Sequence, residues 1–68
     1  MQENSILINM NDIPQDPFML LSWVNMKLRD QYDSLDQLTD DLQLDKKELT
    51  HRLSEAGFEY MPGINQFR

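Results

Sequence analysis

Three polar side chains that could bind a charged group recur at helical spacing, namely Ser22, Asn25 and Arg29. Residues three and four apart lie on one face of an α-helix, so these side chains would form a strip along it. The planar guanidinium of an arginine binds carboxylates through two parallel N–H groups. One interpretation is therefore a small polar pocket in which Arg29 receives a carboxylate from a ligand or a partner peptide. Its other members would be Asn25, Tyr60 and Asn65.

A structural role for the same strip is the alternative interpretation. Buried polar groups need hydrogen-bond partners, and the strip lies between two apolar faces of its helix. Asn25 and Arg29 would then hold backbone groups of the C-terminal segment around Tyr60 and Asn65, or Arg29 would pair with Asp33. Both interpretations stay open at this point.

A second group of side chains, Met19, Trp23 and Met26, lies almost opposite the core stripe of the same helix. Methionine and tryptophan are enriched at the centres of protein interfaces, and a chain this short gains stability by sharing a core. One expectation is that the N-terminal arm or the C-terminal tail covers at least part of this face, since apolar helical stripes are most often core. The other is that these three residues bind a partner, either a second copy of the chain in a homodimer or another protein.

Metal and catalytic chemistry find little support. Five carboxylates fall between residues 30 and 41, but without the alternating spacing of a calcium loop, and two of them flank a helix N-terminus where negative charge is favourable. His51 is the only histidine and there is no cysteine, so a zinc site lacks ligands. The two glycines form no phosphate-binding loop, and neither Ser34 nor Ser54 sits in a nucleophile motif. We expect no enzyme activity, no metal and no cofactor.

Nucleic-acid binding is the alternative function. The segment from Leu35 to Tyr60 is similar to helix-turn-helix modules, whose second helix enters the major groove. That helix would present Lys46, Lys47 and His51 to the nucleic acid. The whole chain, however, has six basic and twelve acidic residues, a net charge of −6, which repels phosphate. We therefore expect nucleic acid to be an unfavourable partner.

The elements that position these groups begin with a helix from Pro17 to about Tyr32. Asp16 suits its N-cap, and proline is favoured at the first helical position. At 100° per residue, one face of this helix is apolar and should lie on the core. This core stripe consists of Leu20, Leu21, Val24, Leu28 and Tyr32.

Two shorter helices follow, each with a capping-box pattern. Ser34 with Gln37 begins one helix, and Asp45 with Glu48 begins the next. Leu44 and Leu49 are placed as a hydrophobic staple at the second start. The core residues of the two helices would be Leu35, Leu38, Leu42, Leu49, Leu53 and Ala56.

The end of the chain carries two glycine signals. Gly57 is expected in the left-handed conformation of a Schellman cap, with Phe58 folding back on Leu53. Pro62 and Gly63 are typical of a type II turn within a short extended segment that could form a minimal hairpin.

Length limits what this architecture can contain. A chain of 68 residues forms one small domain, which buries only about 60% of its unfolded surface and leaves little room for a large cavity. Residues 13–68 are predicted to form a single helical domain. Residues 1–12 are predicted to be an N-terminal arm. This arm could be either a frayed strand or a tail that docks on a partner, and the sequence does not distinguish the two. No apolar run could span a membrane and no signal segment begins the chain, so a cytoplasmic location is expected.

Several segments carry a resemblance to a known family. The chain contains, in this order, Pro14-x-Asp-Pro-Phe-Met-Leu-Leu-Ser, Asn25-x-Lys-Leu-Arg-Asp-x-Tyr, Ser34-Leu-Asp-x-Leu, Gly57-Phe-x-Tyr and Asn65-Gln-Phe. From about Met10 to Phe67 it resembles the short bacterial proteins of domain of unknown function 4250. That family has no assigned reaction, cofactor or partner. The resemblance therefore implies a compact bacterial cytoplasmic domain and no particular activity.

Together these observations predict an all-α, compact three-helix domain. Its second and third helices resemble a helix-turn-helix, and a short extended segment follows them. The predicted function is a non-catalytic protein-interaction or self-association module acting through the first helix, with nucleic-acid binding through the third helix as the alternative.

Overall fold

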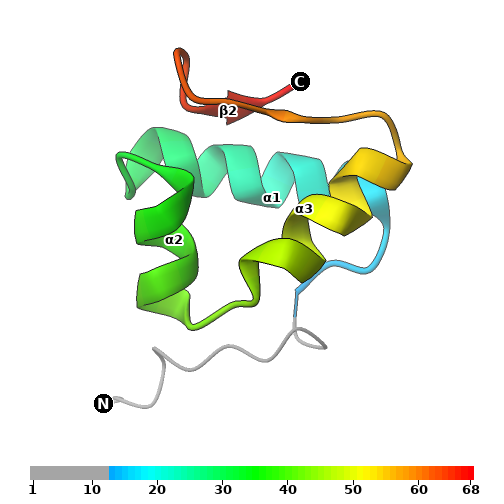
Figure 1. Cartoon of the computed structure of the whole chain (residues 1–68), viewed down its shortest axis with the longest axis horizontal. Helices are drawn as coiled ribbons and strands as arrows, with labels where there is room; N and C mark the ends of the chain where they lie inside the picture. Colours follow the sequence, from blue (N-terminus) through cyan, green and yellow to red (C-terminus); the bar gives the residue numbers. More distant parts are fainter. Residues whose placement is uncertain (1–12) are drawn as a thin grey trace.

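Three helices and a two-stranded hairpin make up the computed structural model, which describes residues 13–68. Figure 1 shows helix α1 (Pro17–Asp30) crossing the molecule between the hairpin above it and the other two helices below it. Those helices are α2 (Leu35–Leu42) and α3 (Lys46–Glu55). The predicted three-helix, mostly helical domain is confirmed, while the predicted N-terminal arm over residues 1–12 lies outside the described residues.

Helix α1 begins as predicted. The Asp16 carboxylate accepts hydrogen bonds from the backbone N–H groups of Phe18 and Met19, and Pro17 takes the first helical position. The helix ends at Asp30 rather than at Tyr32, because the N–H of Tyr32 donates to the carbonyl oxygen of Lys27, five residues back, instead of continuing the regular four-residue pattern. The predicted end was therefore two residues too late.

The capping boxes of α2 and α3 form only in part. The Ser34 hydroxyl accepts from the N–H of Gln37 and the Asp45 carboxylate accepts from the N–H of Glu48, as predicted. The predicted reciprocal hydrogen bonds, from the backbone N–H of each N-cap residue to the side chain three residues later, are not formed. The Gln37 side chain accepts from the N–H of Asp33 instead of Ser34, and the Glu48 carboxylate accepts from Arg52 one turn further along the helix.

Helix α2 ends in a left-handed residue that the sequence did not reveal. Gln43 has φ 56° and ψ 45°, and the N–H of Leu44 donates to the carbonyl oxygen of Thr39 at 2.9 Å. This is the geometry of a Schellman cap, in which glycine is the usual left-handed residue. The cap turns the chain through Gln43, Leu44 and Asp45 directly into α3.

Gln43→Gly is expected to stabilise the protein by about 0.5–1 kcal/mol, because glycine adopts a positive φ without the steric cost that a Cβ imposes. The measurement is urea denaturation followed by circular dichroism. Gln31→Gly is the matched control, since Gln31 also follows a helix but has φ −130°. The control should lose stability, and a loss in Gln43→Gly as well would contradict the account.

The C-terminal end of α3 matches its prediction. Gly57 has φ 91°, the N–H of Gly57 donates to the Ser54 carbonyl oxygen, and the N–H of Phe58 donates to that of Leu53. Both bonds of the predicted Schellman motif are therefore present. Phe58 packs against the buried cluster that includes Leu53.

Beyond Phe58 the chain forms an antiparallel hairpin of β1 (Tyr60–Met61) and β2 (Gln66–Phe67), with Tyr60 opposite Phe67. The predicted type II turn is wrong, because it requires a positive φ at Gly63 and none is present there. The N–H of Ile64 instead donates to the Met61 carbonyl oxygen, and that of Asn65 donates to the Pro62 carbonyl oxygen. The positive φ falls on Asn65, at 52°.

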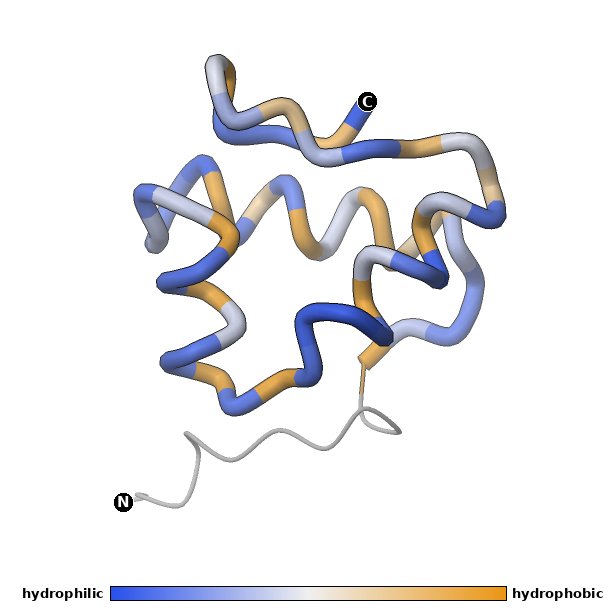
Figure 2. The backbone as a smooth tube through the Cα atoms, viewed as in Figure 1, coloured by the Kyte–Doolittle hydropathy of each residue, from blue (hydrophilic) through white to orange (hydrophobic). Residues whose placement is uncertain are grey.

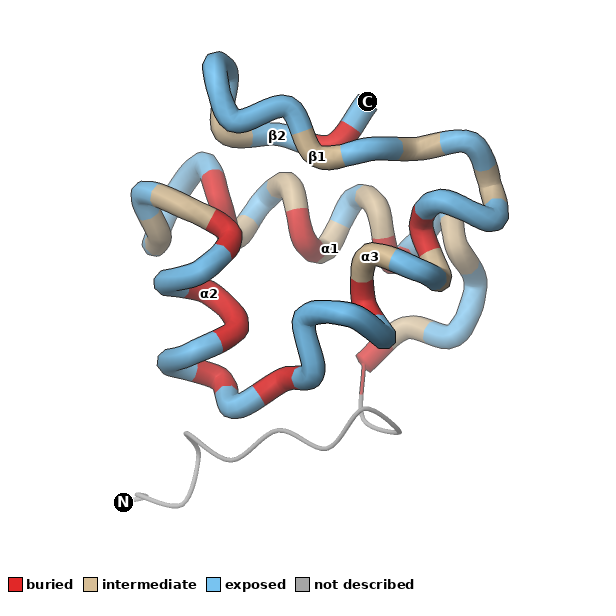
Figure 3. The backbone as a smooth tube through the Cα atoms, viewed as in Figure 1, coloured by how far each residue is buried: buried red, intermediate tan, exposed pale blue. Residues whose placement is uncertain are grey.

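The core lies where the three helices and the hairpin meet, and Figure 3 marks buried positions along the three helices and on β2. Figure 2 shows hydrophobic residues at intervals along the same elements. Of the predicted core residues, Leu21, Tyr32 and Ala56 are only half-buried. Phe67 of β2 is 2% exposed and fills the space between the hairpin and the helices. The buried hydrophobic residues are Ile13, Leu20, Val24, Leu28, Leu35, Leu38, Leu42, Leu44, Leu49, Leu53 and Phe67.

No helix among the described residues is long and apolar enough to cross a membrane.

Candidate functional site

An uncharged apolar surface lies along the side of α1 that faces away from the core. Met19 is 64% exposed, Phe18 63% and Met26 44%, while Trp23 between them is half-buried and packs against the core. We call Phe18, Met19, Trp23 and Met26 the α1 surface. With Pro14 and Ser22 these residues line an open depression of about 540 Å³.

Two neighbours define the edges of the α1 surface. The Lys27 ammonium lies 5.7 Å from the centre of the Trp23 ring, a cation–π distance. The Phe18 ring meets the Phe58 ring edge to face, with their centres 5.7 Å apart. The α1 surface thus has a fixed aromatic end and a basic edge.

The C-terminal tail contacts the α1 surface only at one end, where Phe58 meets Phe18, and it leaves Met19 and Met26 exposed among the described residues. The other expected cover, the N-terminal arm, lies outside the described residues. The hairpin lies instead along the neighbouring side of α1, where it meets the polar strip. The side chains of Met19 and Met26 consequently remain in solvent among the described residues. The hairpin adds two exposed apolar side chains of its own, Met61 and Ile64, which the sequence analysis missed because each stands alone among polar or turn residues.

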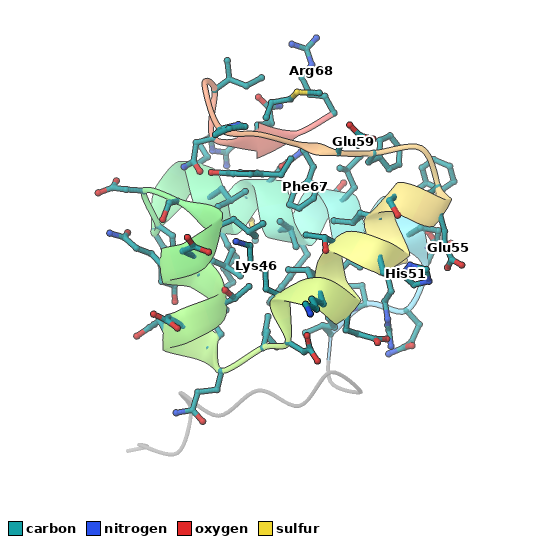
Figure 4. The ribbon with its side chains drawn as sticks, viewed as in Figure 1. Lys46, His51, Glu55, Glu59, Phe67 and Arg68 are labelled. Carbon is teal, nitrogen blue, oxygen red and sulfur yellow. The ribbon has the colours of Figure 1, made fainter. Side chains whose placement is uncertain are left out.

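Asn25 holds the edge of β2. Its side-chain Nδ2 donates to the Phe67 carbonyl oxygen at 3.1 Å, and its Oδ1 accepts from the Phe67 N–H at 2.8 Å. In an antiparallel pair the backbone groups of alternate residues point away from the partner strand. Glu59 and Arg68 exchange the hairpin bonds, so the N–H and carbonyl of Phe67 point toward α1 and meet Asn25. Figure 4 shows Phe67 between the hairpin and the helices.

Tyr60 and Asn65 form a second connection between the hairpin and the helices. The Tyr60 hydroxyl donates to Asn65 Oδ1 at 2.6 Å and accepts from the N–H of Leu35, the first residue of α2. Asn65 Nδ2 donates to the carbonyl oxygens of Leu28 and Tyr32, at the end of α1. One amide and one hydroxyl therefore join the end of α1, the start of α2 and the hairpin.

Arg29 does not join these groups, and it pairs with neither the tail nor Asp33. Its guanidinium donates to the adjacent Asp30 carboxylate at 3.0 Å, and its side chain is 74% exposed. The hydrogen bond between them raises the pKa of Arg29 and lowers that of Asp30. An exposed pair of this kind adds little to stability. Arg29, Asn25 and Asn65 do share a groove of about 670 Å³ between α1 and the hairpin loop, with Arg29 at its rim.

The corner between α1 and α2 is fixed by a further hydrogen bond. The Tyr32 hydroxyl donates to the Asp41 carboxylate at 2.6 Å. Burial of the phenol, together with this hydrogen bond, raises the pKa of Tyr32 to about 12. Among the described residues, no cluster of acidic or histidine side chains could hold a metal ion, and the carboxylates between residues 30 and 41 do not converge.

Most basic groups of α3 have an acidic partner. Lys46 Nζ lies 2.6 Å from the Asp36 carboxylate, His51 Nε2 lies 3.3 Å from that of Glu55, and Arg52 pairs with Glu48. Figure 4 shows Lys46 on the side of α3 toward α2, and His51 with Glu55 near the opposite end. Lys47 is exposed and pairs with no carboxylate of the described residues. The three residues of the nucleic-acid hypothesis therefore do not form one basic surface.

The fold and the α1 surface define a small helical domain in which a C-terminal hairpin packs against one side of α1 and does not cover another. The chain belongs to the family described as Domain of unknown function (DUF4250), whose model matches residues 14–67. The family resemblance is thereby confirmed over nearly the whole described domain. No curated protein and no solved structure matches the chain.

Proposed function

We propose that this protein is a non-catalytic, self-associating interaction module of the cytoplasm, and that its contact surface is the α1 surface. The observation that carries this proposal is the exposure of Phe18, Met19 and Met26 beside the half-buried Trp23, with no charged side chain among them. Contiguous exposed apolar patches on small soluble proteins mark sites of interaction. Flexible methionines and a rigid tryptophan suit the centre of such a contact.

A second copy of the chain is the partner that the distribution of charge favours. Helix α2 and the corner before it carry four of the acidic residues, and helix α1 carries only one. Two copies that meet through α1 keep most of their like charges apart and bury an uncharged patch on each side. The remaining repulsion between chains of net charge −6 is long-ranged and is screened by salt.

Nucleic-acid binding through Lys46, Lys47 and His51 has weaker support. Lys46 already pairs with Asp36, and His51 lies beside the Glu55 carboxylate, so phosphate contacts would have to displace both carboxylates. A lone exposed lysine supplies too little charge to offset an acidic surface. We therefore retain self-association as the single proposed function.

Met26→Lys tests the proposal by placing a charge on the α1 surface of both copies of a symmetric dimer. We expect the dissociation constant to rise at least about tenfold, because a buried unpaired ammonium is costly. The measurement is sedimentation equilibrium over a wide protein concentration range, in which the wild-type mass should rise from 8.1 kDa toward twice that value.

Met61→Lys is the matched control, since Met61 is 40% exposed against 44% for Met26 but lies on the hairpin. It should associate like the wild type. Because neither side chain belongs to the buried core, neither variant should lose helix content. A wild-type chain that stays monomeric at every concentration, or equal weakening in both variants, would refute the proposal.

A further inference from the structure

We infer that Met19 and Met26 are sites of reversible oxidation to methionine sulfoxide, and that this modification controls contact through the α1 surface without unfolding the domain. The inference rests on the proposed self-association and adds its regulation. The oxidant is hydrogen peroxide, which transfers one oxygen atom to the thioether sulfur and releases its other oxygen as water. Two observations carry the inference, the exposure of the methionines and the composition of the core.

Every methionine among the described residues lies at the surface. Met19 is 64% exposed, Met26 44% and Met61 40%. Methionine more often belongs to the interior of a protein, where the surrounding side chains shield its sulfur. At these three positions a dissolved oxidant has direct access to the thioether. The described part of the chain therefore offers peroxide a sulfur on α1 and on the hairpin, and none in the core.

The core itself offers no group that peroxide oxidises. Its buried side chains are those of isoleucine, leucine, valine and phenylalanine, and Thr39 is the one buried polar residue among the described residues. Methionine oxidation disrupts a protein when it places a polar oxygen inside a packed core. In this domain the new oxygen atoms project into solvent. The helices and their packing should consequently survive complete oxidation of the described methionines.

Oxidation does change the chemistry of the α1 surface. Met19 and Met26 line the same depression as Phe18 and Trp23, and no charged side chain lines it. A sulfoxide is polar, whereas the thioether that it replaces is apolar. Burial of a polar oxygen in an apolar contact is unfavourable unless a donor pairs with it. Sulfoxides on the α1 surface therefore weaken association, whereas a sulfoxide at Met61 lies on the hairpin and leaves that surface unchanged.

Association and oxidation should also oppose each other. A contact through the α1 surface covers Met19 and Met26, so peroxide reaches their sulfurs in the dissociated chain. A modification confined to the free chain shifts the equilibrium toward the free chain by mass action. We expect the oxidation of Met19 and Met26 to slow at least about fivefold when the protein is concentrated from monomer to dimer. The rate at Met61 should not depend on concentration.

Peroxide treatment followed by peptide mass spectrometry, circular dichroism and sedimentation equilibrium tests the inference. The wild-type protein should gain sulfoxide at Met19 and Met26, keep its helix content, and show a dissociation constant raised at least about tenfold. Methionine sulfoxide reductases for both sulfoxide epimers, supplied with a dithiol that becomes a disulfide as the oxygen leaves as water, should restore the original constant.

The double substitution Met19→Leu with Met26→Leu is the matched variant, because leucine keeps the apolar volume and has no sulfur. It should associate equally before and after peroxide treatment, whereas Met61→Leu should respond like the wild type. Dissociation of the treated double variant would overturn the inference and leave self-association intact. So would a wild-type dimer that persists with sulfoxide at both sites, or a loss of helix content on oxidation. An untreated wild type that is monomeric at every concentration would overturn the proposed function and its control by oxidation together.

Discussion

Replacing Asn25 by alanine is expected to lower the free energy of unfolding by about 2–4 kcal/mol, since it leaves the N–H and the carbonyl of buried Phe67 without partners. Each unsatisfied buried backbone group costs about 1–3 kcal/mol. The better helix propensity of alanine returns only about 0.5 kcal/mol of the loss. Urea denaturation followed by circular dichroism measures the change.

Two variants separate this effect from a general sensitivity of α1. Ser22→Ala changes an exposed residue on the same strip and should alter stability by less than about 0.5 kcal/mol. Asn25→Asp keeps the acceptor for the Phe67 N–H but removes the donor to its carbonyl, so it should also destabilise the protein. Equal stability of Asn25→Ala and Ser22→Ala would show that the hairpin does not depend on Asn25.

Asn65→Ala is the second substitution with a large expected effect, again about 2–4 kcal/mol. It removes both side-chain bonds to the end of α1 and the acceptor for the Tyr60 hydroxyl. It also forces an alanine into a backbone conformation with φ 52°. The same denaturation experiment measures the loss.

Asn65→Gly distinguishes the two causes, because glycine accepts the positive φ but offers no amide. It should recover about 1 kcal/mol of the loss in Asn65→Ala and remain well below the wild type. If Asn65→Gly were as stable as the wild type, the side-chain network would contribute nothing, and only the backbone conformation of the turn would matter.

Local sequence patterns predicted the features that local physics controls. The caps at Asp16, Ser34 and Asp45 and the glycine stop at Gly57 depend on residues within one turn of the chain, and each is present. The apolar stripe of α1 likewise follows from helical geometry. These signals placed all three helices and the side of α1 that faces the core.

Contacts between distant residues could not be read in the same way. The Asn25–Phe67 pair spans 42 residues, and Asn65 reaches 33 and 37 residues back to Tyr32 and Leu28. The sequence grouped Asn25, Tyr60 and Asn65 correctly but could not assign their partners. Arg29 was placed with them because of its spacing, although a long side chain at a helix end reaches solvent as easily as a neighbour.

The two left-handed residues that are not glycine show a related limit. Glutamine rarely adopts a positive φ, so nothing in the sequence marked Gln43. At the hairpin, the Pro62-Gly63 pair drew the prediction to the wrong residue, because asparagine tolerates the same conformation two positions later.

The position of the hairpin connects the fold to the proposed function. By occupying the polar side of α1, the hairpin satisfies Asn25 and buries Phe67, but among the described residues it leaves the α1 surface partly open, with Met19 and Met26 exposed and Trp23 half-buried. The side chain of Trp23 lies at the centre of that surface. It is also the single tryptophan of the chain, so its fluorescence reports on the α1 surface alone.

The most direct test of the central claim is the quenching of Trp23 fluorescence by acrylamide across a dilution series, alongside the sedimenting mass. The account predicts that quenching is weak where the mass is that of a dimer and becomes stronger on dilution, with the same midpoint as dissociation. Quenching that stays constant while the mass halves would place the interface away from α1 and contradict the account.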